Sequence, residues 1–233
     1  GFRHLLQKDT GEQPKIQEET KLKEWVDAQE KHENTFPLMI KNKSFFKPVN
    51  EISISSIPQS EQDVIVLFNQ LIAGGVIRGI KLLATSQSKQ YDGVYRYCFK
   101  EPLDNHIFDK EINPLGVQKT EPKTEFISIP KILEYKYNVD ALIDEFNNEE
   151  KKERDINLIV AWELGAKWKQ NYDVTSLLHF DNLHHRQFHG ITHILDSGTN
   201  QIQAIILKEL VDFLNDADGV QKWHEENYGD QIT

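Results

Sequence analysis

The strongest periodic pattern in the chain lies at residues 60–75, where apolar side chains recur at the spacing of an α-helix. Ser60 is a favoured N-cap residue type and Gly74-Gly75 can end a helix, so the pattern predicts a helix between them. Residues 17–34 predict a peripheral helix, because charges of mixed sign surround few apolar positions. Residues 138–154 predict another helix, apolar at its start and highly charged at its end.

Strand-like patterns fill much of the remaining chain. They lie at 76–86, 91–101, 125–137, 155–165, 190–197 and the first part of 202–216, which then passes into a final helix. The nearly continuous apolar run around 156–163 is typical of a central strand buried on both faces. This order predicts an α/β fold, with a mixed central sheet flanked by helices.

Polar segments divide the chain further. Residues 102–125 contain three prolines and a glycine, which predicts a long loop that protrudes from the sheet and is mobile. Residues 166–189 are predicted to be irregular. Because the chain starts with GFRHLL rather than methionine, we expect a piece of a longer protein. Within this chain, residues 1–57 would be an N-terminal linker with a peripheral helix, and residues 58–233 would form one α/β domain.

Composition narrows the class of protein. The chain of 233 residues is 38% hydrophobic and 27% charged, which is ordinary for a soluble protein. No run approaches the ~18 apolar residues of a membrane helix, and no signal-peptide pattern opens the chain. Cys98 is the single cysteine, which excludes an intrachain disulfide and a cysteine-based zinc cluster. We therefore expect an intracellular protein, cytoplasmic or, in a eukaryote, nuclear, with no membrane partner.

The net charge of −10 counts against a stand-alone, high-affinity DNA binder, which usually carries a basic face. It does not count against a metal-dependent site. Any DNA contact would rest on a local patch, on a neighbouring domain or on a second copy of the chain.

The candidate chemistry lies in ILEYKYNVDALIDEF, residues 132–146, where a strand pattern runs into a helix pattern. Glu134 and Lys136 share one face of that strand, and Asp92 stands at the start of the strand at 91–101. If these strands are neighbours, two carboxylates converge beside a lysine. A hard cation such as Mg²⁺, or Mn²⁺, would relieve their repulsion, with the Tyr135 carbonyl as a further ligand and Glu61 within reach.

In that arrangement the ion would activate a water and stabilise charge on a phosphate, while Lys136 would orient the water or offset negative charge. Other interpretations are open. Glu134 and Lys136 could form a solvated ion pair on a surface strand, worth little to stability. Glu61 could merely stabilise the dipole of the helix that it starts.

A helix with an early Glu61, YDG with Asp92, LEYKY with Glu134-x-Lys136, then a helix and the strand INLIVAWE together resemble a known core. It is that of the PD-(D/E)xK nuclease superfamily, the restriction-endonuclease-like fold, and the resemblance covers roughly 58–165. It implies that Asp92 and Glu134 hold the metal, that Lys136 assists the attacking water and that Glu61 supports the site.

Two departures from the family pattern stand out. Tyr91 replaces the proline of the motif's name, and the long gap from Asp92 to Glu134 requires residues 102–125 to loop out. The chain also resembles domains at the C-terminus of larger proteins that carry a GHKL-type ATPase, which would explain its unusual start.

Histidines at 179–193 suggest a second metal hypothesis. His185, His189 and His193 are spaced by four residues, but Gly190 interrupts a helix between them, so loop and strand positions are the competing interpretation. Arg186 is either a phosphate contact or a plain surface arginine.

Two functions follow from the sequence. The first is a metal-dependent nuclease, cutting DNA within a larger defence or repair-like machine. The second is a nuclease fold kept as a scaffold that binds a partner or nucleic acid without cutting. The complete acid, acid and lysine set favours the first, and the net acidity favours the second or an enzyme that needs its partner to hold DNA.

Overall fold

The computed structural model describes residues 12–41, 52–87, 90–118 and 124–228, which divide into two compact units. The first unit comprises residues 12–39 and 55–57, and the remaining described residues form the second. Helix α1 (Glu12–Thr35) forms most of the first unit and confirms the helix expected at 17–34. Its end is tied to the later segment, because the His32 Nε2 atom lies 2.9 Å from the carbonyl oxygen of Ile57.

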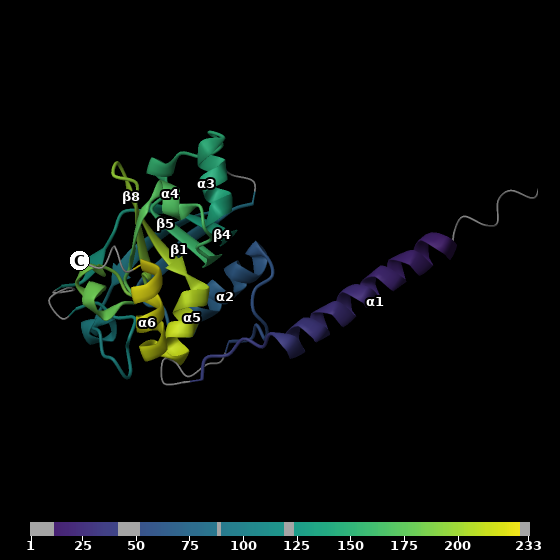
Figure 1. Cartoon of the computed structure of the whole chain (residues 1–233), viewed down its shortest axis with the longest axis horizontal. Coiled ribbons are helices and arrows are strands. Elements are labelled where there is room, and N and C mark those ends of the chain that lie inside the picture. The colour runs from purple at the N-terminus through teal and green to yellow at the C-terminus, as the bar shows by residue number, and fades with distance from the viewer. Residues whose placement is uncertain (1–11, 42–51, 88–89, 119–123, 229–233) are drawn as a thin grey trace, which may run out of the picture. The chain divides into compact units, whose positions relative to one another are not determined.

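The second unit is an α/β structure built on an open, mixed sheet of eight strands. Its strands run in the order β1-β2-β4-β5-β8-β7-β6, and β3 pairs with β2. Strands β4, β5 and β8 are parallel to one another, and every other pair is antiparallel. Figure 1 labels β1, β4, β5 and β8 of this sheet. The strands are β1 (Ile80–Thr85), β2 (Gly93–Phe99), β3 (Phe126–Ile127), β4 (Lys131–Asn138), β5 (Leu158–Glu163), β6 (Asp173–Ser176), β7 (His193–Asp196) and β8 (Gln201–Ile206).

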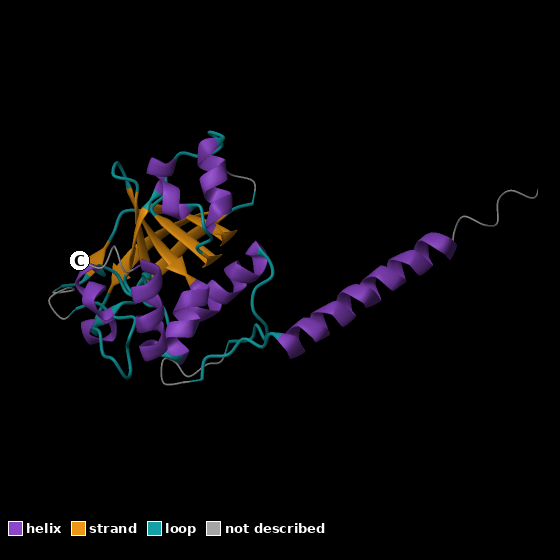
Figure 2. Ribbon diagram, viewed as in Figure 1, coloured by secondary structure: helices purple, strands orange, loops and turns teal. Residues whose placement is uncertain are grey.

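Helices flank both faces of this sheet (Figure 2). On one face, α3 and α4 join a core cluster with the side chains of Ile159 and Ala161. On the other face, the ring of Phe68 in α2 packs edge-on against Tyr135 of β4. Helix α5 follows β8 directly, and α6 packs against α5. The helices of this unit are α2 (Glu61–Ala73), α3 (Val139–Asn147), α4 (Trp168–Asn171), α5 (Leu207–Asn215) and α6 (Ala217–Tyr228).

Local sequence explains the elements that the periodicity predicted. Ser60 caps α2, since its hydroxyl accepts from the Asp63 amide while the Asp63 carboxylate accepts from the Ser60 amide, which is a capping box. Strand β5 is buried on both faces, from Leu158 at 0% exposure to Trp162 at 4%, as its continuous apolar run predicted. The shift from strand to helix at residue 207 is confirmed as well.

The prediction of a protruding loop at 102–125 is wrong for residues 113–117, whereas residues 109–112, 118, 124 and 125 are exposed as expected, and the mobility of the segment stays a prediction. Residues 113–117 are buried, and Arg186 holds them by donating from one guanidinium nitrogen to the carbonyl oxygens of Pro114 and Gly116, both at 2.9 Å. The same guanidinium also donates to Leu177. Arg186 is therefore neither a surface residue nor free for a phosphate. Residues 119–123 lie outside the described part.

Other boundaries also differ from the predictions. Helix α3 ends at Asn147 instead of continuing to residue 154, because Glu149 adopts a left-handed backbone with φ of 60°. Strand β6 forms inside the segment expected to be irregular, and α6 is an additional helix after the one predicted to be last. Strand β1 begins four residues later than expected, after a turn at 74–79. Among the described helices, none combines the length and apolarity that crossing a bilayer requires.

Candidate functional site

The predicted site residues lie where β2 and β4 meet. The two strands pair antiparallel, with Gly93 opposite Leu133, so the expected neighbourhood of these strands is confirmed. Asp92 directly precedes β2. Gly93 beside it fits closely, because a Cβ atom there would lie 3.1 Å from the Leu133 Cδ2 atom and 3.2 Å from the Ala84 carbonyl oxygen. The glycine of YDG thus lets the chain bring Asp92 against β4.

Asp92 and Glu134 are held together by reciprocal hydrogen bonds across this strand pair. The Asp92 amide donates to Glu134 Oε1 at 3.1 Å, and the Tyr135 amide donates to Asp92 Oδ2 at 2.9 Å. The Glu134 side chain is fully buried. The Tyr135 ring lies on the opposite face of the sheet, against Phe68. Two acids therefore meet at one end of β2, as the alternation in LEYKY predicted.

Lys136 lies two residues further along β4, on the same face as Glu134. Its side chain is 9% exposed, and its Nζ atom lies 2.8 Å from Glu145 Oε1 of α3 and 3.9 Å from Glu61 Oε2. The interpretation of Glu134 and Lys136 as a solvated surface pair is therefore wrong, since both side chains are buried. Glu145 is an acid that the sequence analysis missed.

Glu61 is the first residue of α2 and approaches the same group of charges. Burial raises the pKa of Glu61, Lys136 lowers it and the charge of Asp92 raises it again. The position suits both interpretations of Glu61, because it starts a helix and also faces the acid and lysine cluster.

Lys151 completes the cluster and was not predicted. Its Nζ atom lies 2.5 Å from Glu134 Oε2 and 3.1 Å from Glu145 Oε2, and its side chain is 12% exposed. The charge run NNEEKKERD predicts a solvated helix end, which would leave this lysine in water. Because the helix ends at Asn147, the chain instead turns back and places Lys151 among the acids.

The charges of this cluster shift one another's pKa values. Burial raises the pKa of Glu134 to about 7; the hydrogen bond from Lys151 opposes that rise, and the charge of Asp92 adds to it. Burial alone would lower the pKa of Lys151, but its hydrogen bond to Glu134 raises the pKa above its usual value. Burial would raise the pKa of Glu145, yet the hydrogen bonds from Lys136 and Lys151 lower it.

The donor set suits a hard divalent ion in chemistry and charge. Four carboxylates (Glu61, Asp92, Glu134 and Glu145) surround two ammonium groups, which leaves a formal charge of −2 when all are ionised. Among the described residues, however, no three side chains of histidine, cysteine, aspartate or glutamate are arranged as a ready ligand group. The acids point at lysines and backbone amides instead. Asp92, Glu134 and the Tyr135 carbonyl stay a predicted ion site.

The three spaced histidines do not converge. His185 is exposed, whereas His189 is buried and uses both ring nitrogens, one 2.7 Å from Asn113 Oδ1 and one 3.2 Å from the Arg78 amide. His193 lies in β7, and its Nε2 atom is 3.0 Å from Glu209 Oε2. His189 and His193 are thus engaged in loop and strand packing, and His185 lies on the surface.

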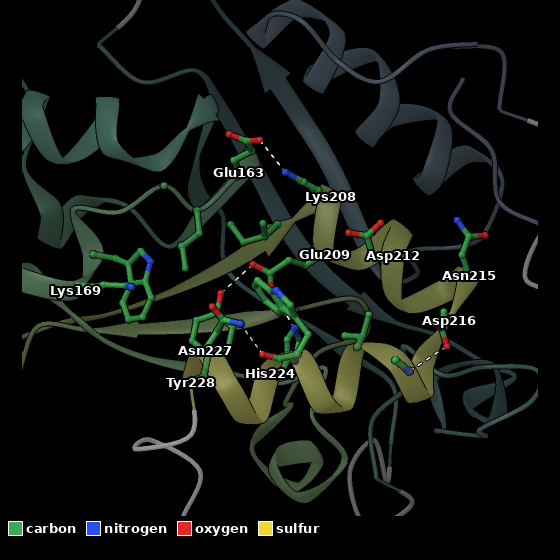
Figure 3. Close-up of a pocket in the computed structure, with 17 residues that line it drawn as sticks. Glu163, Lys169, Lys208, Glu209, Asp212, Asn215, Asp216, His224, Asn227 and Tyr228 are labelled. Carbon is green, nitrogen blue, oxygen red and sulfur yellow. Dashed lines mark hydrogen bonds and ion pairs between the residues drawn. The ribbon is translucent and has the colours of Figure 1, made fainter. Parts of the chain in front are cut away.

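A cavity of about 750 Å³ opens elsewhere, between α5 and α6 at the carboxyl ends of β5 and β8 (Figure 3). The ion pair of Glu163 with Lys208, 3.0 Å long, crosses one side of it. Beneath it, Glu209 accepts from Tyr228 at 2.9 Å and lies 3.0 Å from His224 Nε2. None of the predicted site residues lines this cavity.

Glu209 is a buried acid with several partners. Burial would raise its pKa, but the neighbouring imidazoles of His193 and His224 bring it well below the usual value. Ser176 contacts the other ring nitrogen of His224. The hydrogen-bonded network around Glu209 therefore links β6, β7, α5 and α6. This network therefore stabilises the fold at the far end of the sheet.

Comparison with known proteins identifies no relative. No protein-family model matches the chain, and neither the curated proteins nor the solved structures include one with significant similarity to it.

Proposed function

We propose that this chain carries a metal-dependent nuclease domain of the PD-(D/E)xK type, with a restriction-endonuclease-like core, which hydrolyses phosphodiester bonds of DNA. The observation that carries the proposal is the meeting of Asp92 and Glu134 where β2 and β4 pair, with Lys136 two residues further along β4 on the face of Glu134. A fully buried carboxylate beside a second acid is costly to the fold, and catalytic sites are where such costs recur.

The residues have separate roles in the proposed site. Asp92 and Glu134 would hold a Mg²⁺ or Mn²⁺ ion, which when bound polarises a phosphate and makes a coordinated water more acidic. Lys136, fixed by Glu145 at 2.8 Å, would orient the attacking water and offset charge that develops on the phosphate. Glu61 would support the cluster from the start of α2.

The net charge shapes how DNA would be held. At −10, the chain repels the phosphate backbone, and this repulsion weakens binding most at low salt. We therefore propose that a neighbouring domain of a longer protein, or a second copy, supplies the positive surface, and that the chain alone cuts feebly.

A second candidate is a scaffold that binds a partner or nucleic acid without cutting. The ion pairs of Lys136 and Lys151 favour it, because they satisfy the acids of the cluster without any metal. A plasmid-cleavage assay with Mg²⁺ or Mn²⁺ separates the two. The nuclease proposal expects nicked or linear product from the longer parent protein and almost none from its Lys136→Ala variant. Equal cutting by both proteins would exclude a catalytic role of Lys136. If no parent protein cuts, the scaffold function is supported instead.

A further inference from the structure

The acid cluster already contains a cation. The ammonium of Lys151 lies 2.5 Å from Glu134 Oε2 and 3.1 Å from Glu145 Oε2, while the other oxygen of Glu134 accepts from the Asp92 amide. Lys151 thus covers the one oxygen of Glu134 that the backbone leaves open. A divalent ion bound to that oxygen would meet the ammonium at the same place.

The two cations exclude each other on electrostatic grounds. A lysine ammonium and a divalent ion repel strongly at contact distance, especially in a site that water hardly enters. Lys136 differs in this respect, because its ammonium bonds Glu145 Oε1 and leaves both Glu134 oxygens to other groups.

The segment that carries Lys151 can release it without unfolding α3. Helix α3 ends at Asn147, and Lys151 lies beyond the left-handed turn at Glu149. The backbone hydrogen bond of Lys151 to Glu145 is long, at 3.4 Å. Its side chain has a flexible four-carbon stem, so rotation alone can move the ammonium toward solvent.

We propose that Lys151 is a positioning residue that occupies the ion site of the proposed nuclease, holds Glu134 and Glu145 in place without metal, and leaves when a divalent ion binds. This inference rests on the proposed function. It makes ion binding and lysine release one event, so the lysine lowers the apparent ion affinity by the cost of breaking its two ion pairs.

Binding of Mn²⁺, followed by electron paramagnetic resonance on the 233-residue chain, tests the inference without any activity. Lys151→Met should bind Mn²⁺ about tenfold more tightly than the wild type or better, equivalent to ~1.4 kcal/mol. Lys167→Met is the matched control. Lys167 pairs with Asp144 of α3, the helix that also carries Glu145, but Lys167 is exposed and lies outside the cluster. It should leave the affinity unchanged.

A second measurement uses the wild type and does not depend on a variant that folds. An amine-acetylating reagent, read by mass spectrometry, should modify Lys151 slowly without ion and several-fold faster with Mn²⁺. Lys167 is the internal reference and should react at one rate throughout.

The outcomes separate the inference from the proposed function. Tighter Mn²⁺ binding by Lys151→Met with faster acetylation of Lys151 supports the inference even if no plasmid is cut, in which case the nuclease proposal fails. Plasmid cutting with unchanged affinity and unchanged acetylation overturns the inference and leaves the nuclease proposal standing. Absence of Mn²⁺ binding in both proteins overturns the inference.

Discussion

At the scale of single residues, Glu134 is the group of the candidate site whose charge is most costly to bury. Its side chain has no exposed surface, and two like charges, Asp92 and Glu145, stand close to it. Removing one partner of a buried pair costs several kcal/mol because the other charge is left alone. The cluster therefore tolerates conservative changes far better than truncations.

Asp92 illustrates this difference. Asp92→Asn keeps an oxygen for the Tyr135 amide, so it should fold normally yet lose Mn²⁺ binding and DNA cutting. Asp92→Ala should lose both as well and should also cost about 1–3 kcal/mol, because it leaves that amide without its acceptor. Thermal melts beside Mn²⁺ titrations check the pair. Retained Mn²⁺ affinity in Asp92→Asn would show that Asp92 is no ligand.

Glu209 should make stability depend on pH in the acid range. Its pKa is lowered on folding from the ordinary value of 4.5, so the unfolded chain binds more protons at low pH. The stability it confers is complete above about pH 4.5 and is lost as the pH falls toward the folded pKa. His193 and His224 face the carboxylate and lower its pKa, and Tyr228 also donates a hydrogen bond to it.

Glu209→Gln should therefore flatten the decline of the melting temperature below about pH 5 and should cost about 1.5–3 kcal/mol at neutral pH. Glu226→Gln, on the exposed side of α6, is the control and should change neither quantity. An acid-range slope equal to that of the wild type in Glu209→Gln would contradict the assignment.

Sequence alone predicts part of the site. Glu134 and Lys136 are found because strand alternation places them on one face. Asp92 is found because YDG opens the strand that pairs with theirs. Lys151 is invisible to such patterns, since its role depends on where α3 ends. Glu145 is likewise hidden, because it occupies an ordinary polar position on an amphipathic helix.

At the scale of elements, the largest gap between pattern and structure is the segment 102–118. Its prolines and polar residues predict exposure, yet Leu115 and Val117 are buried. Distant residues hold it: the Arg186 guanidinium, 70 positions beyond Gly116, donates to the carbonyl oxygens of Pro114 and Gly116, and the Gly190 amide donates to that of Leu115. Long-range pairing of this kind leaves no local signal in the sequence. The periodic elements α2, β5 and the turn from β8 to α5, by contrast, are predictable from local pattern.

Arg186→Lys should test whether the guanidinium of Arg186 holds the segment 102–118 in place. A lysine ammonium cannot reproduce the planar fork that serves three carbonyl groups, so the change should cost at least about 2 kcal/mol. Limited proteolysis should then cut first within 102–118. Arg154→Lys, at an exposed arginine, is the control. An unchanged melting temperature and an unchanged cleavage pattern in Arg186→Lys would show that the segment packs without the hydrogen bonds of the guanidinium.

At the scale of the whole molecule, the acid site and the acidic surface oppose each other. The proposed reaction requires a phosphate at the site, while a net charge of −10 repels phosphates. A basic neighbouring domain in a longer parent protein would resolve this conflict. We predict that the parent cuts plasmid DNA faster than this chain does, and that the difference widens as salt is lowered, since screening weakens the repulsion. Equal rates at all salt concentrations would remove the need for such a partner.

The most direct test of the central claim is a crystal structure of the chain soaked in Mn²⁺, with anomalous scattering used to locate the ion. The nuclease proposal predicts an anomalous peak about 2.0–2.3 Å from carboxylate oxygens of both Asp92 and Glu134. The inference about Lys151 predicts in addition that its ammonium has left Glu134. A structure at saturating Mn²⁺ with no peak at these carboxylates, and with Lys151 still bonded to Glu134, would contradict the account.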